Sequence, residues 1–82
     1  MLKAVKVPLD EIYIPTDRRK TLDGGKVEVL AESILEEGLN KPIQVRQGKG
    51  RYVLVTGLHR LEALRSLGEN TADAYIVAAR QF

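Results

Sequence analysis

The chain of 82 residues contains no cysteine and no tryptophan, and only one histidine. Without cysteine it can form no disulfide, no thiolate metal site and no cysteine nucleophile. A single histidine also falls short of the roughly four Cys or His ligands that a structural zinc site requires. The fold must therefore be held together by aliphatic packing, and 44% of the residues are hydrophobic.

The sequence also lacks a long apolar run and a strong net charge. No stretch approaches the roughly 20 apolar residues of a membrane-spanning helix. The start, 1-MLKAVKVPLDEI-12, has neither the apolar core nor the cleavage site of a signal peptide, so we expect a cytoplasmic protein. The formal net charge of +2 is too small to predict nucleic-acid binding by itself. The length fits a single domain over residues 1–82.

A stripe of apolar residues predicts a helix over residues 26–37. Its members recur at i, i+3, i+4 and i+7, namely Val27, Leu30, Ala31 and Ile34. Thr21 or Asp23 can cap the first turn, because their side-chain oxygens accept its free amide protons. Gly38 stands where a left-handed C-terminal cap is favoured. The polar stretch 16–25 is expected to be a loop.

Short strands and a second helix complete the predicted domain. Alternating or β-branched residues predict strands over 3–7, 11–14, 43–46, 51–56 and 74–78. The connector 47-QGKG-50 suits a hairpin loop. A second helix is expected over 58–67, between two glycines. This order indicates a small mixed α/β domain with a mixed sheet and two main helices.

The segment 55-VTGLHRLEAL-64 places a glycine, a histidine and an arginine where a strand meets a helix. The first amides of a helix lack intrahelical partners and carry a partial positive charge. Gly57 lets a ligand approach the backbone, His59 adds a donor, and Arg60 offers a planar fork suited to phosphate oxygens. These features fit an anion site, and they also fit an ordinary strand–helix junction with solvated side chains. No Walker-type or G-x-G-x-x-G motif is present.

Two longer runs resemble the N-terminal domain that ParB partition proteins share with sulfiredoxins. They are 22-LDGGKVEVLAESILEEGLNKPIQVR-46 and 52-YVLVTGLHRLEALRSLGE-69. The helix and hairpin look closest to the ParB N-terminal (ParB-like nuclease) domain. The turn 57-GLHR-60 looks like the sulfiredoxin GCHR turn without its cysteine. The similarity covers nearly the whole domain, and it implies the ParB/sulfiredoxin-like fold.

The resemblance implies that this domain binds ATP or CTP, usually with Mg²⁺, and holds the phosphates at the turn. Carried over residue by residue, the phosphate-binding set is Gly57, Leu58, His59, Arg60, Lys26, Ser33 and one of Arg18 and Arg19. Val29 stands where sulfiredoxins usually have a serine that contacts ATP. Considered without the resemblance, Lys26 is a solvated lysine at a helix start, Ser33 carries no signal, and 18-RRK-20 is a solvated basic loop. No protein-only metal site is expected.

Leu58 occupies the position of the sulfiredoxin cysteine. Leucine can neither attack a phosphoryl group nor carry a thiol intermediate, so sulfinic acid reduction is excluded. We expect its side chain to pack under the turn. Asp17 is the only carboxylate in the 17-DRR-19 loop and is the candidate catalytic base. In a binding module Asp17 would instead orient Arg18 or Arg19 or begin a turn, and the sequence favours this simpler role.

The leading hypothesis is a nucleotide-binding module that acts, through partners, in DNA partition or transcription-type regulation. The alternatives are a small phosphotransferase, NTPase or nuclease on the same fold, and a protein-interaction domain without nucleotide. In ParB proteins a helix-turn-helix and a dimerisation segment follow this domain, and neither is expected here. We therefore expect DNA contact to be non-specific or through partner proteins. A homodimer is one option, and no membrane association is expected.

Overall fold

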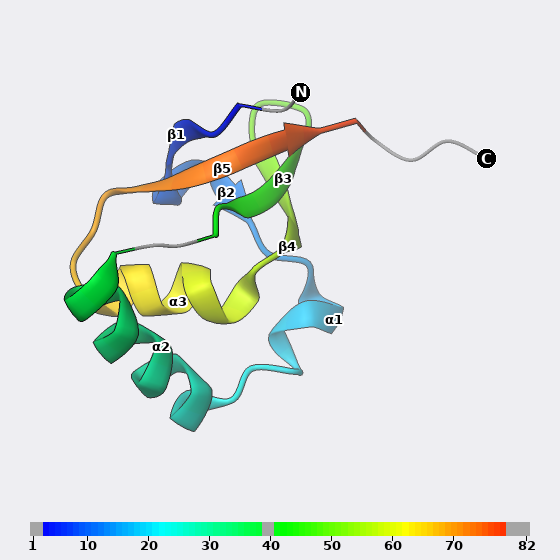
Figure 1. Ribbon diagram of the computed structural model, residues 1–82. Coiled ribbons are helices and arrows are strands. Elements are labelled where there is room, and N and C mark those ends of the chain that lie inside the picture. Colours follow the sequence, from blue (N-terminus) through cyan, green and yellow to red (C-terminus); the bar gives the residue numbers. More distant parts are fainter. Residues whose placement is uncertain (1–2, 39–40, 79–82) are drawn as a thin grey trace.

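The computed structural model describes residues 3–38 and 41–78 (Figure 1). The elements in chain order are β1 (Val5–Pro8), η1 (Leu9–Glu11), β2 (Ile12–Tyr13), α1 (Thr16–Arg19), α2 (Gly24–Glu37), β3 (Ile43–Gln47), β4 (Tyr52–Thr56), α3 (Leu58–Ser66) and β5 (Thr71–Val77). Residues 39–40, which belong to the connector after the first predicted helix, lie outside the described residues. The same holds for both ends of the expected 1–82 domain.

The five strands form one mixed sheet in the order β1-β5-β3-β4-β2. β3 and β4 pair antiparallel as the predicted hairpin, and β1 pairs antiparallel with β5. The parallel pairs are β3 with β5 and β2 with β4. α2 and α3 lie together on the same side of the sheet, as Figure 1 shows. The predicted mixed α/β fold class is confirmed.

β1 and β2 lie at opposite edges of the sheet, although only the three residues of η1 separate them along the chain. In a flat sheet those edges would be four strand spacings apart, about 19 Å. The four residue-to-residue steps from Pro8 to Ile12 can span at most about 14 Å. The sheet must therefore curl. Leu9 and Ile12 are buried in this crossing, and the Leu9 amide donates to the Asn70 carbonyl at 2.9 Å.

The hydrophobic core is enclosed by the curled sheet and α3. Its buried members are Val7, Leu9, Ile12, Ile14, Ile43, Val45, Leu54, Leu58, Leu61, Leu64, Ala72 and Ala74. α3 contributes three of the large side chains, whereas α2 has no fully buried residue. α2 packs mainly on α3, so its predicted apolar stripe is only half-buried. Within the described ranges, no helix has the length and apolarity needed to cross a membrane.

Three local features differ from the sequence predictions. The segment 16–25 is predicted as a loop, but Thr16–Arg19 forms the helical turn α1. Pro15 precedes it with a φ of −56°, a value that favours entry into a helical turn. α2 begins at Gly24 rather than at residue 26, because Asp23 and not Thr21 caps it. β5 begins at Thr71, where Thr71 pairs with Pro8, three residues before the predicted start.

Candidate phosphate-binding turn and its cavity

α3 starts directly after β4, through Gly57 in the left-handed conformation with φ 109° and ψ 32°. No side chain of the described residues caps this helix. Its first backbone hydrogen bond runs from the Leu61 amide to the Gly57 carbonyl at 2.8 Å. Within the described part of the chain, the amides of Leu58, His59 and Arg60 have no hydrogen-bond acceptor. The start of α3 therefore presents three free donors and the positive end of a helix dipole.

The start of α2 is satisfied in a different way. The Asp23 side chain accepts hydrogen bonds from the amides of Gly25 at 2.9 Å and Lys26 at 3.4 Å. This is the N-cap arrangement that the sequence predicts as one of two alternatives. Comparing these two helix starts within the described residues, only that of α3 is left open to an external anion.

Both helix starts face one cavity of about 730 Å³. Its lining comes from α1 and the following loop (Arg18, Thr21, Asp23), from α2 (Gly25, Lys26, Val29, Leu30) and from the α3 turn (Gly57, Leu58, His59, Arg60). Among residues 3–38 and 41–78, none of the three lining cations forms an ion pair. Three cations and a single carboxylate leave the cavity electropositive, which favours an anionic ligand.

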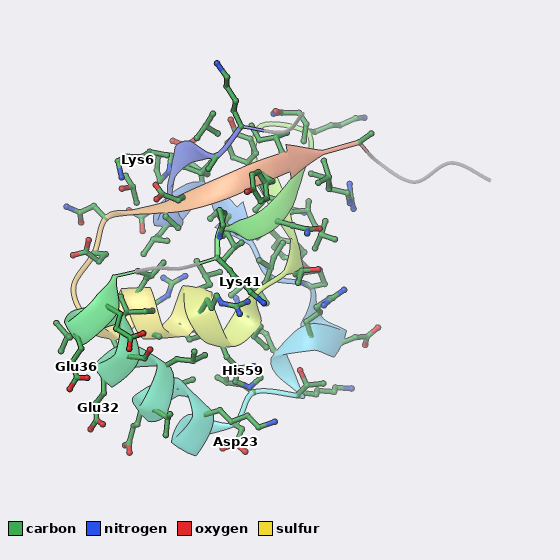
Figure 2. All side chains as sticks on the ribbon, in the orientation of Figure 1. Lys6, Asp23, Glu32, Glu36, Lys41 and His59 are labelled. Atoms are coloured by element: carbon green, nitrogen blue, oxygen red, sulfur yellow. The ribbon has the colours of Figure 1, made fainter. Side chains whose placement is uncertain are left out.

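His59 makes the contact that joins the two sides of the cavity. Its Nε2 accepts a hydrogen bond from the backbone amide of Asp23 at 3.1 Å. Figure 2 shows the ring of His59 reaching from α3 toward the segment that leads into α2, whereas Glu32 and Glu36 extend from α2 away from α3. The sequence predicts a donor role for His59, but in the structure its Nε2 accepts a hydrogen bond. The two partners are 36 positions apart in the sequence, so no local pattern predicts the contact.

The structure brings most of the predicted phosphate-binding residues to this cavity. Gly57 to Arg60, Lys26 and Arg18 all line it. Leu58 is buried and packs into the core beneath the turn, as the sequence predicts. Of the two alternative arginines, Arg19 borders a separate hollow beside Glu62. The structure thus brings Arg18, and not Arg19, to the turn.

Two predicted residues lie apart from the cavity, and several lining residues are not predicted. Ser33 is half-buried on α2, and Asp17 is exposed in α1; neither lines the cavity. The lining residues that the sequence does not assign to the site are Thr21, Asp23, Gly25 and Leu30. Helical spacing carries a signal for Leu30, since it lies at i+4 from Lys26 on the same side of α2.

The cavity offers little to a metal ion by itself. No group of three or more His, Cys, Asp or Glu side chains that could hold a metal occurs in the described ranges. Asp23 is the only carboxylate among the lining residues, and its Oδ1 already caps α2. A hard cation would therefore depend on oxygen ligands that a bound molecule supplies.

Fold and site define a small mixed α/β domain with an open, basic helix start. A model of the ParB N-terminal domain matches residues 2–81, and the chain belongs to that family. It is 41% identical over 64 residues to the chloroplastic/mitochondrial sulfiredoxin of Arabidopsis thaliana, covering 78% of this chain and 51% of that protein. It is 35% identical over 80 residues to a probable chromosome-partitioning protein ParB of Helicobacter pylori. That match covers 96% of this chain and 28% of the Helicobacter protein.

Solved structures agree with this assignment. The sulfiredoxin of Arabidopsis thaliana superposes with a TM-score of 0.83 at 36% identity, over 94% of this chain and 86% of that one. A truncated ParB of Caulobacter crescentus in complex with CTP-γ-S superposes with a TM-score of 0.83 at 26% identity. The superposition covers 96% of this chain and 46% of the ParB chain. A free serine kinase variant in complex with AMP superposes with a TM-score of 0.76 at 27% identity, over 90% of this chain and 30% of the kinase chain. The chain spans less than half of the ParB and kinase chains. These superpositions confirm the predicted ParB/sulfiredoxin-like fold.

Proposed function

We propose that this chain is a nucleotide-binding module that holds the phosphates of ATP or CTP, with Mg²⁺, at the turn between β4 and α3. One observation carries the proposal: three amides and three cations that have no partner among the described residues converge on the same cavity. Similar structures contain CTP-γ-S in a ParB and AMP or ADP in a serine kinase, which supports a nucleotide as the anion.

The backbone amides and each of the three cations have distinct roles in this proposal. The amides of Leu58 to Arg60 donate to phosphate oxygens at the helix start. The Arg60 guanidinium adds a planar, bidentate contact. Lys26 lies in the first turn of α2, where a cation opposes the helix dipole, and a bound anion removes that conflict. Arg18 contributes from α1 on the other side of the cavity.

The nucleoside would lie against the apolar part of the lining. Val29 and Leu30 of α2 provide this wall, and Val29 is 69% exposed. A cavity of about 730 Å³ is large enough for a nucleotide-sized molecule. Valine cannot make the hydrogen bond that serine supplies at this position in sulfiredoxins, so we assign Val29 to apolar contact.

Mg²⁺ would enter as part of the nucleotide complex. It requires oxygen ligands and usually takes them from phosphates, water and one or two carboxylates. Among the lining residues only Asp23 has a carboxylate. Phosphate oxygens and water would therefore supply most of the ligands of the ion. The ion would neutralise phosphate charge beside the three cations.

The geometry favours binding over phosphoryl transfer. General-base catalysis requires a carboxylate or a similar base within hydrogen-bond reach of the attacking hydroxyl. The candidate base Asp17 does not line the cavity, and the Oδ1 atom of Asp23 is engaged by the amides of Gly25 and Lys26. With Leu58 in place of a cysteine, the turn lacks a thiol nucleophile.

The bound nucleotide would serve as a ligand that changes the partners of the domain, in DNA partition or transcription-type regulation in the cytoplasm. Membership of the ParB N-terminal domain family supports this role. So does similarity to a nucleoid occlusion protein of Halalkalibacterium halodurans, 35% identical over 72 residues. DNA would be reached through partner proteins or by non-specific contacts, and a homodimer remains part of the proposal.

Calorimetric titration of the protein with ATP, CTP and GTP, each with and without Mg²⁺, tests the proposal. We expect Arg60→Ala to weaken nucleotide binding by about 1–3 kcal/mol, the typical contribution of a charge-assisted contact. Arg65→Ala is the matched control, because Arg65 lies on the same helix outside the cavity and pairs with Glu62 at 3.7 Å. A wild-type chain that binds none of the nucleotides, or equal affinity in both variants, would contradict the proposal.

A further inference from the structure

The hydrogen bond between His59 and Asp23 connects the starts of two helices. Through its backbone amide Asp23 donates to Nε2 of His59 on α3, and through its Oδ1 it accepts from the amide of Lys26 on α2. One residue thus links the phosphate turn to the lysine on the opposite side of the cavity. α2 has no fully buried residue and packs mainly on α3, so little else holds its first turn in place.

The direction of this hydrogen bond determines the protonation of the ring. An amide N–H donates only to a nitrogen with a free lone pair, so Nε2 carries no proton and the neutral ring carries its proton on Nδ1. In this arrangement Nε2 cannot donate to a phosphate oxygen. The other charged groups that face the cavity are Arg18, Lys26 and Arg60, together with the Asp23 carboxylate.

We propose that His59 is a positioning residue of the nucleotide site. Through Asp23 it holds the Lys26 end of α2 against the α3 turn, and it does not bind phosphate through Nε2. The inference rests on the proposed function, and it assigns His59 a role different from that of the two cations. Its effect is preorganisation: a cavity already assembled before binding spares the ligand the cost of ordering it.

Two substitutions separate positioning from direct contact. His59→Gln keeps a neutral acceptor about as far from the backbone as Nε2, whereas His59→Phe keeps a ring and has no acceptor. We expect His59→Phe to bind Mg-ATP or Mg-CTP about fivefold more weakly, the usual effect of one lost neutral hydrogen bond. We expect His59→Gln to stay within about twofold of wild type, since the acceptor is retained.

Two NMR measurements on the nucleotide-free protein report on the hydrogen bond itself. In wild type, the imidazole ¹⁵N shifts should show a protonated Nδ1 and an unprotonated Nε2. Hydrogen exchange of the Asp23 amide should be slowed in wild type and in His59→Gln, and it should be fast in His59→Phe. If His59→Phe does not fold, as judged by circular dichroism, His59→Gln and the wild-type spectrum decide the question.

The outcomes distinguish this inference from the proposed function. A His59→Gln variant as weak as His59→Phe, with its Asp23 amide still protected, would make His59 a direct phosphate ligand and overturn the inference. So would wild-type affinity in His59→Phe, or a protonated Nε2 in the wild-type spectrum. Absence of nucleotide binding by wild type with the Asp23 amide protected would instead overturn the proposed function, and the positioning role would fall with it.

Discussion

Gly57 packs directly against Ile43. A Cβ atom at position 57 would lie 2.7 Å from Ile43 Cγ2 and 3.0 Å from Ile43 Cβ. Ile43 is fully buried at the start of β3, and Gly57 has a φ of 109°. Two independent constraints, the backbone conformation and the close approach of the sheet, therefore require glycine at this turn. The position of the phosphate turn relative to the core follows from this contact.

Gly57→Ala is expected to destabilise the fold by about 2–4 kcal/mol, because it adds backbone strain and overpacking against Ile43. Chemical denaturation followed by circular dichroism measures this loss. Gly24→Ala is the control, since a Cβ there has no neighbour within 4 Å and the residue is the first of α2. Equal stability of the two variants would show that the turn does not need glycine.

Asp23→Ala is expected to cost about 1 kcal/mol of unfolding free energy, because it removes the cap from the amides of Gly25 and Lys26. Asp23→Asn should retain most of the stability, since an amide oxygen is also a good cap. Thermal or urea unfolding of the three proteins provides the comparison. If the alanine and asparagine variants lose the same amount, the side-chain cap does not stabilise α2.

Leu58→Cys is expected to create a buried thiol rather than a reactive one. Leu58 is only 7% exposed, and its side chain belongs to the hydrophobic core. A thiol-specific reagent should therefore label it slowly in the native protein and rapidly after denaturation. Thr56→Cys, at an exposed position two residues earlier, should be labelled at once. Rapid native labelling of Leu58→Cys would place this side chain on the surface.

Two adjacent arginines provide a matched test of the cavity. Arg18→Gln is expected to weaken nucleotide binding by about 1–2 kcal/mol, since Arg18 lines the cavity and has a charged donor to lose. Arg19→Gln removes the same charge one residue away, beside Glu62 in a different hollow, and should leave the affinity nearly unchanged. Titration at low and moderate salt measures both. A larger loss in Arg19→Gln would reverse the assignment of the two residues.

Much of the fold follows from local patterns. The apolar stripe predicts α2, and Gly38, with a φ of 80°, ends it as expected. The connector 47–50 between β-branched runs predicts the hairpin of β3 and β4. These elements depend on neighbours within a few positions. Helix α1 is not predicted from the sequence, because its four polar residues form no periodic pattern.

The candidate site divides in the same way. The glycine, the arginine and the open helix start at 57–60 could be recognised from the sequence, because they are consecutive and belong to one turn. The choice of Arg18 over Arg19 could not, since it depends on how α1 faces the cavity. The acceptor role of His59 also escaped prediction, because its partner Asp23 lies on another element.

The sequence by itself determined most of the elements, the family and the residue types at the turn, because each of these is encoded by spacing along a short stretch. Only the tertiary structure decided that β1 and β2 form opposite edges of a curled sheet, that Ser33 and Asp17 lie away from the cavity, and that His59 joins the two helix starts. Those relationships depend on the packing of segments distant in the chain. Core packing and the limited reach of the chain set them, and no local pattern contains that information.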